Sequence, residues 1–140
     1  MVADFGLWVR YLVVRDTRTG KFLRVHVWLG VALVLAGFLT GITGVVTFRK
    51  AHTTIDPITP RASSLVTWGV YSVSRNPMYL GGLIMLLGWG LFVSNAVAFV
   101  VLPMYVLYIN RFQIAPEERA LRSLFEATYV AYQAQVRRWL

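Results

Sequence analysis

Apolar residues dominate two long tracts of this 140-residue chain, and neither tract contains Asp, Glu, Lys or Arg. The first, residues 25–48, is about as long as one helical crossing of a bilayer, which takes roughly 20 residues. The second, residues 76–110, is too long for one crossing and has a polar break at its middle, Ser94-Asn95. The pattern predicts three transmembrane helices, the last two forming a hairpin, at about residues 25–48, 77–93 and 96–110.

Helical signals also lie at the two ends of the chain. Residues 5–14 are apolar apart from Arg10 and too short to span, which predicts a short N-terminal helix. Pro116 suits the first turn of a helix, and Glu117 and Glu118 follow where the helix dipole favours negative charge. We therefore expect an all-α integral membrane protein with a C-terminal amphipathic helix that lies on the membrane surface or covers the central loop.

Composition agrees with a membrane protein. The chain is 57% hydrophobic and 14% charged, whereas soluble domains carry roughly 25% charged residues, and its mean hydropathy is +0.59. Residues 1–140 suffice for a single domain. The absence of cysteine excludes disulfides, thiolate metal sites and cysteine nucleophiles. The two histidines are far apart in sequence, so we expect no metal site.

The formal net charge is +8. Because the basic residues flank apolar tracts, we expect them to face anionic lipid, and we expect membrane lipids rather than nucleic acid as partners. Nine of the 14 Lys and Arg residues lie in the central loop and the C-terminal tail, and five precede residue 25. The positive-inside rule therefore predicts that the loop and the tail face the cytoplasm.

Glycines recur on one face of the first apolar tract. Gly30, Gly37 and Gly44 are seven residues apart, and Gly81 and Gly88 have the same spacing in the first arm of the hairpin. Glycines on one helix face allow a second helix to approach closely. The pattern predicts helix packing, and the face formed by Gly30, Gly37 and Gly44 would also allow a homodimer.

The polar loop at residues 63–79, SSLVTWGVYSVSRNPMY, holds the strongest candidate site. Loops carry function more often than cores do, and this one presents Tyr71, Arg75 and Tyr79 as it enters the hairpin. The hairpin brings the end of this loop close to residues 110–118, and the C-terminal arginines belong to the same side. Each residue also has a structural explanation, as a helix-dipole partner, an aromatic belt or a basic anchor, and only their joint order favours a site.

The run LVTWGVYSVSRNPMYLG at residues 65–81 is followed by two helices and by PEERALRSLFEATYVAYQAQVRR at residues 116–138. This order resembles the isoprenylcysteine carboxyl methyltransferase family, a group that includes phospholipid N-methyltransferases, over residues 49–140. The family binds S-adenosyl-L-methionine without a Rossmann domain, and no strand–GxGxxG–helix unit is visible here. The resemblance implies a methyltransferase of a bacterial inner membrane that acts on a lipid-like, prenyl-like or other small hydrophobic acceptor.

By position, the resemblance and the charges of the cofactor imply three groups of site residues. The cofactor-binding candidates are Ser63, Ser64, Leu65, Val66, Tyr71, Arg75, Asn76, Pro77, Met78, Tyr79 and Glu117. Among them, Glu117 suits the cofactor ammonium and Arg75 its carboxylate. The catalytic candidates are Arg111 and Glu118. Gln113 occupies the position of a substrate arginine in the eukaryotic enzymes, so Gln113 and Arg111 are the substrate-binding candidates.

Two departures from the family pattern matter. Asn76 replaces a histidine and cannot titrate. Glu126 replaces the glycine after Phe125, so we expect that this position needs no glycine backbone. With no histidine base, a carboxylate acceptor, already ionised at neutral pH, is favoured over an amine or a thiol. A catalytically degenerate homologue or assembly subunit, a phospholipid N-methyltransferase and a relative of the sterol reductases remain as alternatives.

Overall fold

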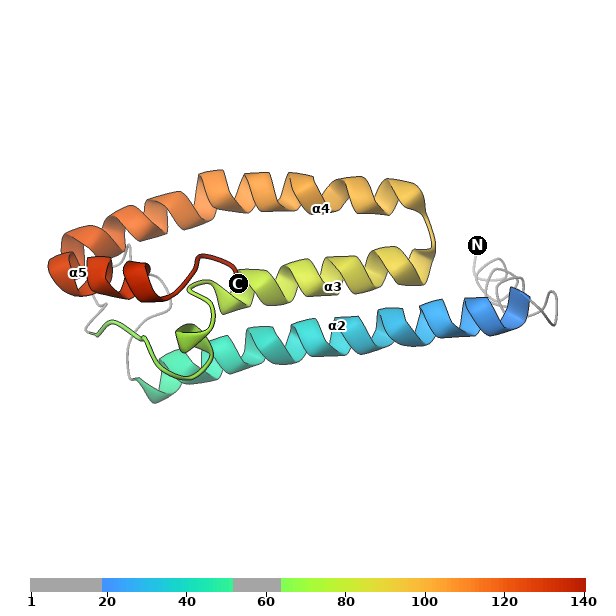
Figure 1. Cartoon of the computed structure of the whole chain (residues 1–140), viewed down its shortest axis with the longest axis horizontal. Coiled ribbons are helices and arrows are strands. Elements are labelled where there is room, and N and C mark those ends of the chain that lie inside the picture. The colour runs from blue at the N-terminus through green and yellow to red at the C-terminus, as the bar shows by residue number, and fades with distance from the viewer. Residues whose placement is uncertain (1–18, 52–63) are drawn as a thin grey trace, which may run out of the picture.

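The computed structural model describes residues 19–51 and 64–140, with side chains described from residue 25. Three helices run side by side along the length of the molecule, and a fourth folds over one end (Figure 1). The elements in order are α2 (Thr19–Lys50), the 3-10 helix η1 (Gly69–Ser72), α3 (Pro77–Val93), α4 (Ala96–Ile109), the π-helix η2 (Asn110–Ile114) and α5 (Ala115–Gln135). The predicted short N-terminal helix lies outside the described residues.

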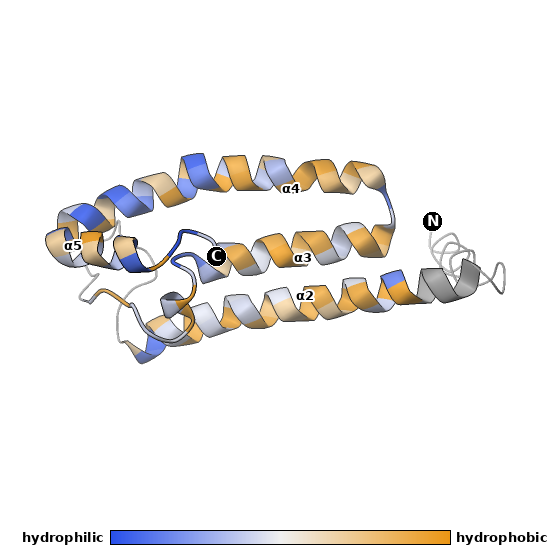
Figure 2. Cartoon of the chain, in the orientation of Figure 1, coloured by the Kyte–Doolittle hydropathy of each residue, from blue (hydrophilic) through white to orange (hydrophobic). Residues whose placement is uncertain are grey.

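Two helical runs in the described part of the chain are long and apolar enough to cross a membrane, judged by length and composition. They are Val25–Lys50 and the continuous run Ala96–Gln135. The third expected span, α3, is a shorter apolar helix of 17 residues, about 26 Å long, whereas the hydrocarbon core is roughly 30 Å thick. Apolar residues cover α2, α3 and α4, and polar residues gather at the α5 end (Figure 2).

The predicted hairpin is confirmed, because α3 ends and α4 begins at the polar break. Ser94 adopts a left-handed conformation, with φ of 52°, and Asn95 caps α4 by accepting a hydrogen bond from the Val97 N–H at 2.9 Å. Helix α2, in contrast, begins at Thr19, before the predicted residue 25. Lysine and arginine are good helix formers, so the helix continues beyond its apolar tract.

Glycines bring α2 and α3 into backbone contact. A Cβ added to Gly37 would lie 2.5 Å from the Gly81 carbonyl oxygen, and one added to Gly30 would lie 2.8 Å from that of Gly88. Because the residue numbers run in opposite directions along the two helices, they are antiparallel. This packing covers the glycine face predicted for a homodimer, which a second copy would reach only by displacing α3. The oligomeric state itself stays a prediction.

One contact between the arms of the hairpin is made by Tyr105 of α4. A Cβ on Gly82 would lie 2.5 Å from the Tyr105 hydroxyl oxygen. That hydroxyl donates to the Tyr79 carbonyl oxygen at 3.1 Å. The contact holds α4 against the first turn of α3.

Helix α4 passes through the π-helix η2 directly into α5. Within α5, Glu126 has φ of 40° and ψ of −119°, and the helix breaks there into two parts. This corrects the expectation that the position needs no glycine backbone, because such angles are essentially restricted to glycine. The break turns residues 127–135 back over the end of the bundle (Figure 1), where Tyr129 and Tyr132 are buried.

The Gly37 contact can be tested by adding one methyl group. We expect Gly37→Ala to destabilise the protein by about 1–3 kcal/mol, because its Cβ would overlap backbone atoms of α3. Gly41→Ala is the matched control, since nothing lies within 4 Å of its added Cβ. Thermal unfolding in detergent measures both, and equal melting temperatures for the two variants would contradict the packing described.

The strained backbone at Glu126 generates a second prediction. We expect Glu126→Gly to stabilise the protein by about 1 kcal/mol, because relief of roughly 1–3 kcal/mol of backbone strain exceeds the entropic cost of glycine. Glu126→Ala removes the same carboxylate but keeps a Cβ, so it should bring no gain. A lower melting temperature for Glu126→Gly than for Glu126→Ala would show that the position is ordinary helix.

Candidate functional site

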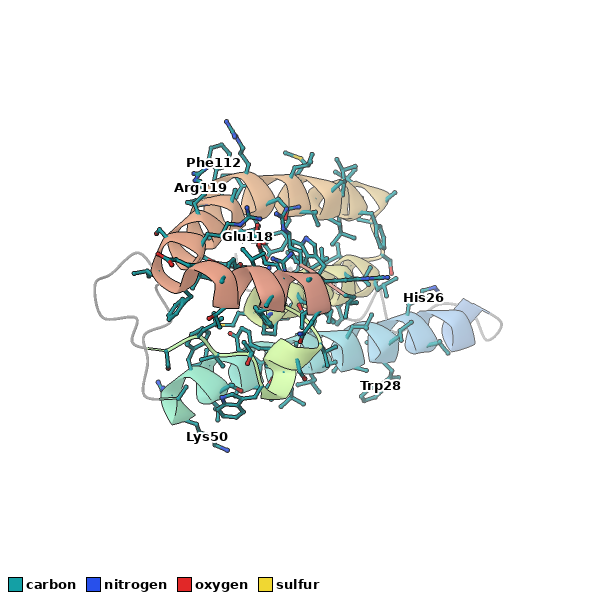
Figure 3. The ribbon with its side chains drawn as sticks, turned by 60° about the vertical axis from the view of Figure 1, so that its left-hand side comes forward. His26, Trp28, Lys50, Phe112, Glu118 and Arg119 are labelled. Carbon is teal, nitrogen blue, oxygen red and sulfur yellow. The ribbon has the colours of Figure 1, made fainter. Side chains whose placement is uncertain are left out.

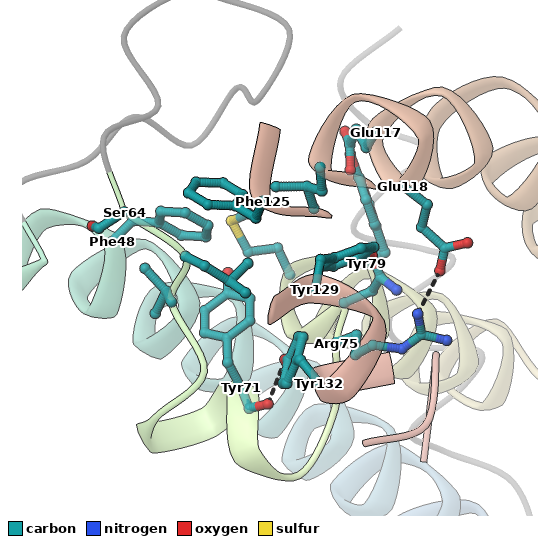
Figure 4. A pocket seen from close by; sticks show the side chains of 15 residues that line it. Phe48, Ser64, Tyr71, Arg75, Tyr79, Glu117, Glu118, Phe125, Tyr129 and Tyr132 are labelled. Atoms are coloured by element: carbon teal, nitrogen blue, oxygen red, sulfur yellow. Dashed lines mark hydrogen bonds and ion pairs between the residues drawn. The ribbon is translucent and has the colours of Figure 1, made fainter. Parts of the chain in front are cut away.

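A cavity lies at the end of the bundle where α2 ends, α3 begins and α5 folds over (Figure 4). Its empty space, counted together with the open mouth, is about 700 Å³. The lining comes from α2, the loop before α3, α3 itself and α5: Phe48, Ser64, Leu65, Val66, Tyr71, Arg75, Asn76, Met78, Tyr79, Glu117, Glu118, Leu121, Phe125, Tyr129 and Tyr132.

One hydrogen bond joins the two halves of the predicted site. The Tyr79 hydroxyl, in the first turn of α3, donates to Glu117 Oε1 at 2.5 Å. The π-helix η2 leads directly into this part of α5. Gln113 and Glu117 are four residues apart across the junction of η2 and α5, and π-helical segments are frequent at functional sites. The helical hairpin thus brings together residues 38 positions apart.

Glu118 is held by two arginines. Arg138 binds it through two hydrogen bonds, from Nε to Oε1 at 3.1 Å and from Nη2 to Oε2 at 2.6 Å. Arg75 Nη1 is 3.0 Å from the same Oε1. The Glu118 side chain is 10% exposed and that of Arg75 is 12% exposed. Removing one partner from so buried an ion pair is costly, because it leaves an uncompensated charge.

The last residues of the chain continue this contact along the start of α3. The backbone N–H of Arg75 donates to the Arg137 carbonyl oxygen at 3.1 Å. The side-chain amide of Asn76 donates to the Arg138 carbonyl oxygen at 2.9 Å. The Trp139 indole N–H donates to Asn110 Oδ1 at 3.2 Å. The amide of Asn76 therefore holds the C-terminal tail, a contact in which no titrating group is needed.

Tyrosines from the returning half of α5 close the inner wall. The Tyr132 hydroxyl donates to the Tyr71 carbonyl oxygen at 2.6 Å. Burial raises the pKa of Tyr71 and of Tyr132 well above the ordinary value. Burial also raises the pKa of Tyr129, with nearby Glu118 adding to the effect and Arg75 opposing it. All three hydroxyls are therefore protonated donors at neutral pH.

Three donor atoms, on two residues that line the cavity, lack hydrogen-bond partners. The Tyr71 hydroxyl is buried without one, and so are Nε and Nη1 of Arg75. The 3.0 Å ion pair from Arg75 to Glu118 lacks the direction of a hydrogen bond. Buried polar groups are rarely left unsatisfied, and such exceptions require an explanation such as a ligand.

Most of the predicted cofactor residues line the cavity, apart from Pro77, which is buried beside it, and Ser63, which lies outside the described residues. Arg111 and Gln113 are exposed and do not line it. Glu118 does, but with its oxygens engaged by arginines. Figure 3 shows Phe112 and Arg119 at the outer edge of the molecule, where η2 continues into α5. The catalytic and substrate assignments stay predictions.

Sequence reasoning did not assign five lining residues to the site: Phe48, Leu121, Phe125, Tyr129 and Tyr132. The last four follow the helical spacing of an apolar face, which is more often core than site. Their one signal was the aromatic spacing within the family pattern. The fold adds the reason, because the break at Glu126 carries two of them back to the cavity.

The lining suits a ligand that has positive charge and flat apolar parts. Its carboxylates outnumber its one guanidinium, and aromatic rings attract cations. In the described residues, no cluster of three His, Asp or Glu side chains could hold a metal ion.

Comparison with known proteins agrees with this architecture. The family model described as phospholipid methyltransferase matches residues 25–128. A Haemophilus influenzae protein described only as uncharacterized is 46% identical over 63 residues, which is 45% of this chain and 100% of that protein. No solved structure matches the chain.

The second relative carries an assigned activity in its name. Protein-S-isoprenylcysteine O-methyltransferase B of Arabidopsis thaliana is 28% identical over 118 residues, covering 81% of this chain. The aligned part is 60% of the plant enzyme's length. The family model alone covers well over half of this chain and includes all of α2, α3 and α4 from residue 25. The resemblance found in the sequence is confirmed, and the chain belongs to the phospholipid methyltransferase family.

Proposed function

We propose that the chain is an integral membrane methyltransferase that binds S-adenosyl-L-methionine in the cavity between α3 and α5. The observation that carries the proposal is the Tyr79–Glu117 hydrogen bond, because it joins the two sequence segments that the family resemblance selects. Family membership supports the class of reaction. The acceptor we propose is lipid-like or a small hydrophobic molecule.

We propose further that α2, α3 and α4 all cross a bacterial inner membrane. Helix α3 packs along the longer helix α2 over their glycine faces. This contact with a helix long enough to span supports a membrane-crossing position for α3 despite its shorter length. Exposed cations gather at the cavity end of the molecule and support a cytoplasmic orientation for it: Arg49, Lys50, Arg111, Arg119, Arg122 and Arg137.

The cofactor's groups match the lining. Glu117 is the partner for its ammonium, and the unsatisfied Arg75 donors suit its carboxylate. The aromatic rings of Phe48, Tyr71 and Phe125 offer apolar surface for the adenine. When bound, S-adenosyl-L-methionine supplies a methyl group on a positively charged sulfur. The chain's own residues then position the reactants, which by itself can account for a large part of a rate enhancement.

We consider two kinds of methyl acceptor. A carboxylate needs no base, and the one lining carboxylate beside Glu117, Glu118, is engaged by two arginines. This supports O-methylation of a carboxylate, as in the name of the plant relative. The family model's description favours a second candidate, the amine of a phospholipid.

Cofactor binding is tested by isothermal titration of S-adenosylhomocysteine, the demethylated product, into the protein in detergent. We expect Glu117→Gln to weaken binding by roughly tenfold or more, since a hydrogen bond to a charged group contributes about 1.5–3 kcal/mol. Tyr79→Phe should weaken it less, because it removes only the group that orients Glu117.

Glu126→Gln is the matched control for that titration, because it removes the same charge from an exposed position on the same helix. It should bind like the unmodified protein. An unmodified protein that binds neither S-adenosylhomocysteine nor S-adenosyl-L-methionine would rule out the proposed function.

The acceptor is tested with methyl-labelled S-adenosyl-L-methionine and fractionated bacterial lipids. If the acceptor is a carboxylate, we expect a labelled product that releases its methyl group as methanol in mild alkali. Label that survives this treatment would exclude a methyl ester, and mass spectrometry of the labelled headgroup would then test for N-methylation. Cofactor binding without transfer to any fraction would support a catalytically degenerate homologue.

A further inference from the structure

Arg138, in the C-terminal tail, and Arg75, in the cavity wall, share the carboxylate of Glu118. Glu118 has two oxygens, and Arg138 holds both of them, at 3.1 and 2.6 Å. Arg75 reaches only Oε1, at 3.0 Å, without hydrogen-bond geometry. Parallel bidentate pairing is the strongest arrangement between a guanidinium and a carboxylate. Arg138 therefore makes the stronger interaction with Glu118, and Arg75 makes the weaker one.

The consequence is that Arg75 keeps unused donors in the cavity wall. Its side chain is only 12% exposed, yet Nε and Nη1 have no hydrogen-bond partner. Its backbone is held by the Arg137 carbonyl oxygen, so the side chain has a fixed origin. A buried guanidinium with unsatisfied donors favours the binding of an anion.

We propose that Arg138 is a positioning residue that keeps Arg75 available for the carboxylate of the bound amino acid group. Without Arg138, the carboxylate of Glu118 turns to pair with Arg75 through both oxygens, and Arg75 is withdrawn from the ligand. The inference rests on the proposed function, because it takes the ligand to be S-adenosyl-L-methionine or its product. Arg138 itself is absent from the cavity lining.

Two ligands distinguish this role from general support of the fold. S-adenosylhomocysteine carries the amino acid carboxylate, whereas methylthioadenosine shares the adenosine and the thioether but lacks it. We expect Arg138→Gln to weaken S-adenosylhomocysteine roughly tenfold, the size of one lost charge-assisted hydrogen bond. Methylthioadenosine, measured in the same isothermal titrations, should bind Arg138→Gln and the unmodified protein equally.

The double variant supplies the rescue. Glu118→Gln combined with Arg138→Gln removes the carboxylate that would capture Arg75, so we expect most of the affinity for S-adenosylhomocysteine to return. Arg137→Gln is the matched control: its side chain is exposed, and the contact to Arg75 uses its backbone oxygen. That variant should bind both ligands normally.

These measurements distinguish the positioning role of Arg138 from cofactor binding itself. Equal weakening of both ligands in Arg138→Gln, no weakening, or a double variant as weak as the single one would each overturn the positioning role while leaving the cofactor assignment intact. An unmodified protein that binds neither ligand would overturn the proposed function, and this inference with it.

Discussion

The rest of the structure depends on the backbone contact between α2 and α3. At Gly37 and Gly81 no side chain separates the helices, and an added Cβ would meet a carbonyl oxygen at 2.5 Å from either side. Such contacts fix the register of two helices, because sliding one along the other would place side chains where only glycine fits. The same register places Met78, at the start of α3, against Gly44, with the Tyr71 hydroxyl close by. The position of the cavity follows from this contact.

A second constraint closes the cavity from the other side. Helix α5 continues α4 and would run away from the bundle if it stayed straight. The break at Glu126 turns it back, and Tyr132 then reaches the Tyr71 carbonyl oxygen. Strained backbone persists where the surrounding structure determines it, and here the buried tyrosines and the Glu118 ion pairs provide that structure. The strain is therefore part of how the site is built.

Charge at the site is divided between two neighbouring carboxylates. Glu118 is occupied by Arg75 and Arg138, whereas Glu117 pairs with the neutral Tyr79 hydroxyl. The two adjacent carboxylates therefore contact different kinds of partner. Consecutive residues on a helix point about 100° apart. Glu117 can therefore face the proposed ligand while Glu118 binds both Arg138 of the C-terminal tail and Arg75 of the loop.

Much of this protein was determined by the sequence alone. The charge-free tracts and the Ser94-Asn95 break gave the helical hairpin almost to the residue, because hydrophobic length and turn chemistry are local properties. Motif order gave the family and most of the cavity lining. The glycine spacing predicted a close contact but could not name the partner, because a small face accepts any helix that fits.

Only the tertiary structure decided the contacts between residues far apart in the chain. It showed that α3 covers the glycine face, that Glu126 has a glycine-like backbone despite its side chain, and that Asn76 holds the tail. It also paired Arg138 with Glu118. These depend on where α5 returns, and that return is set by one backbone torsion and by packing against α3. Local patterns determine which segments are helices, whereas the shared geometry of several helices determines which side chains meet.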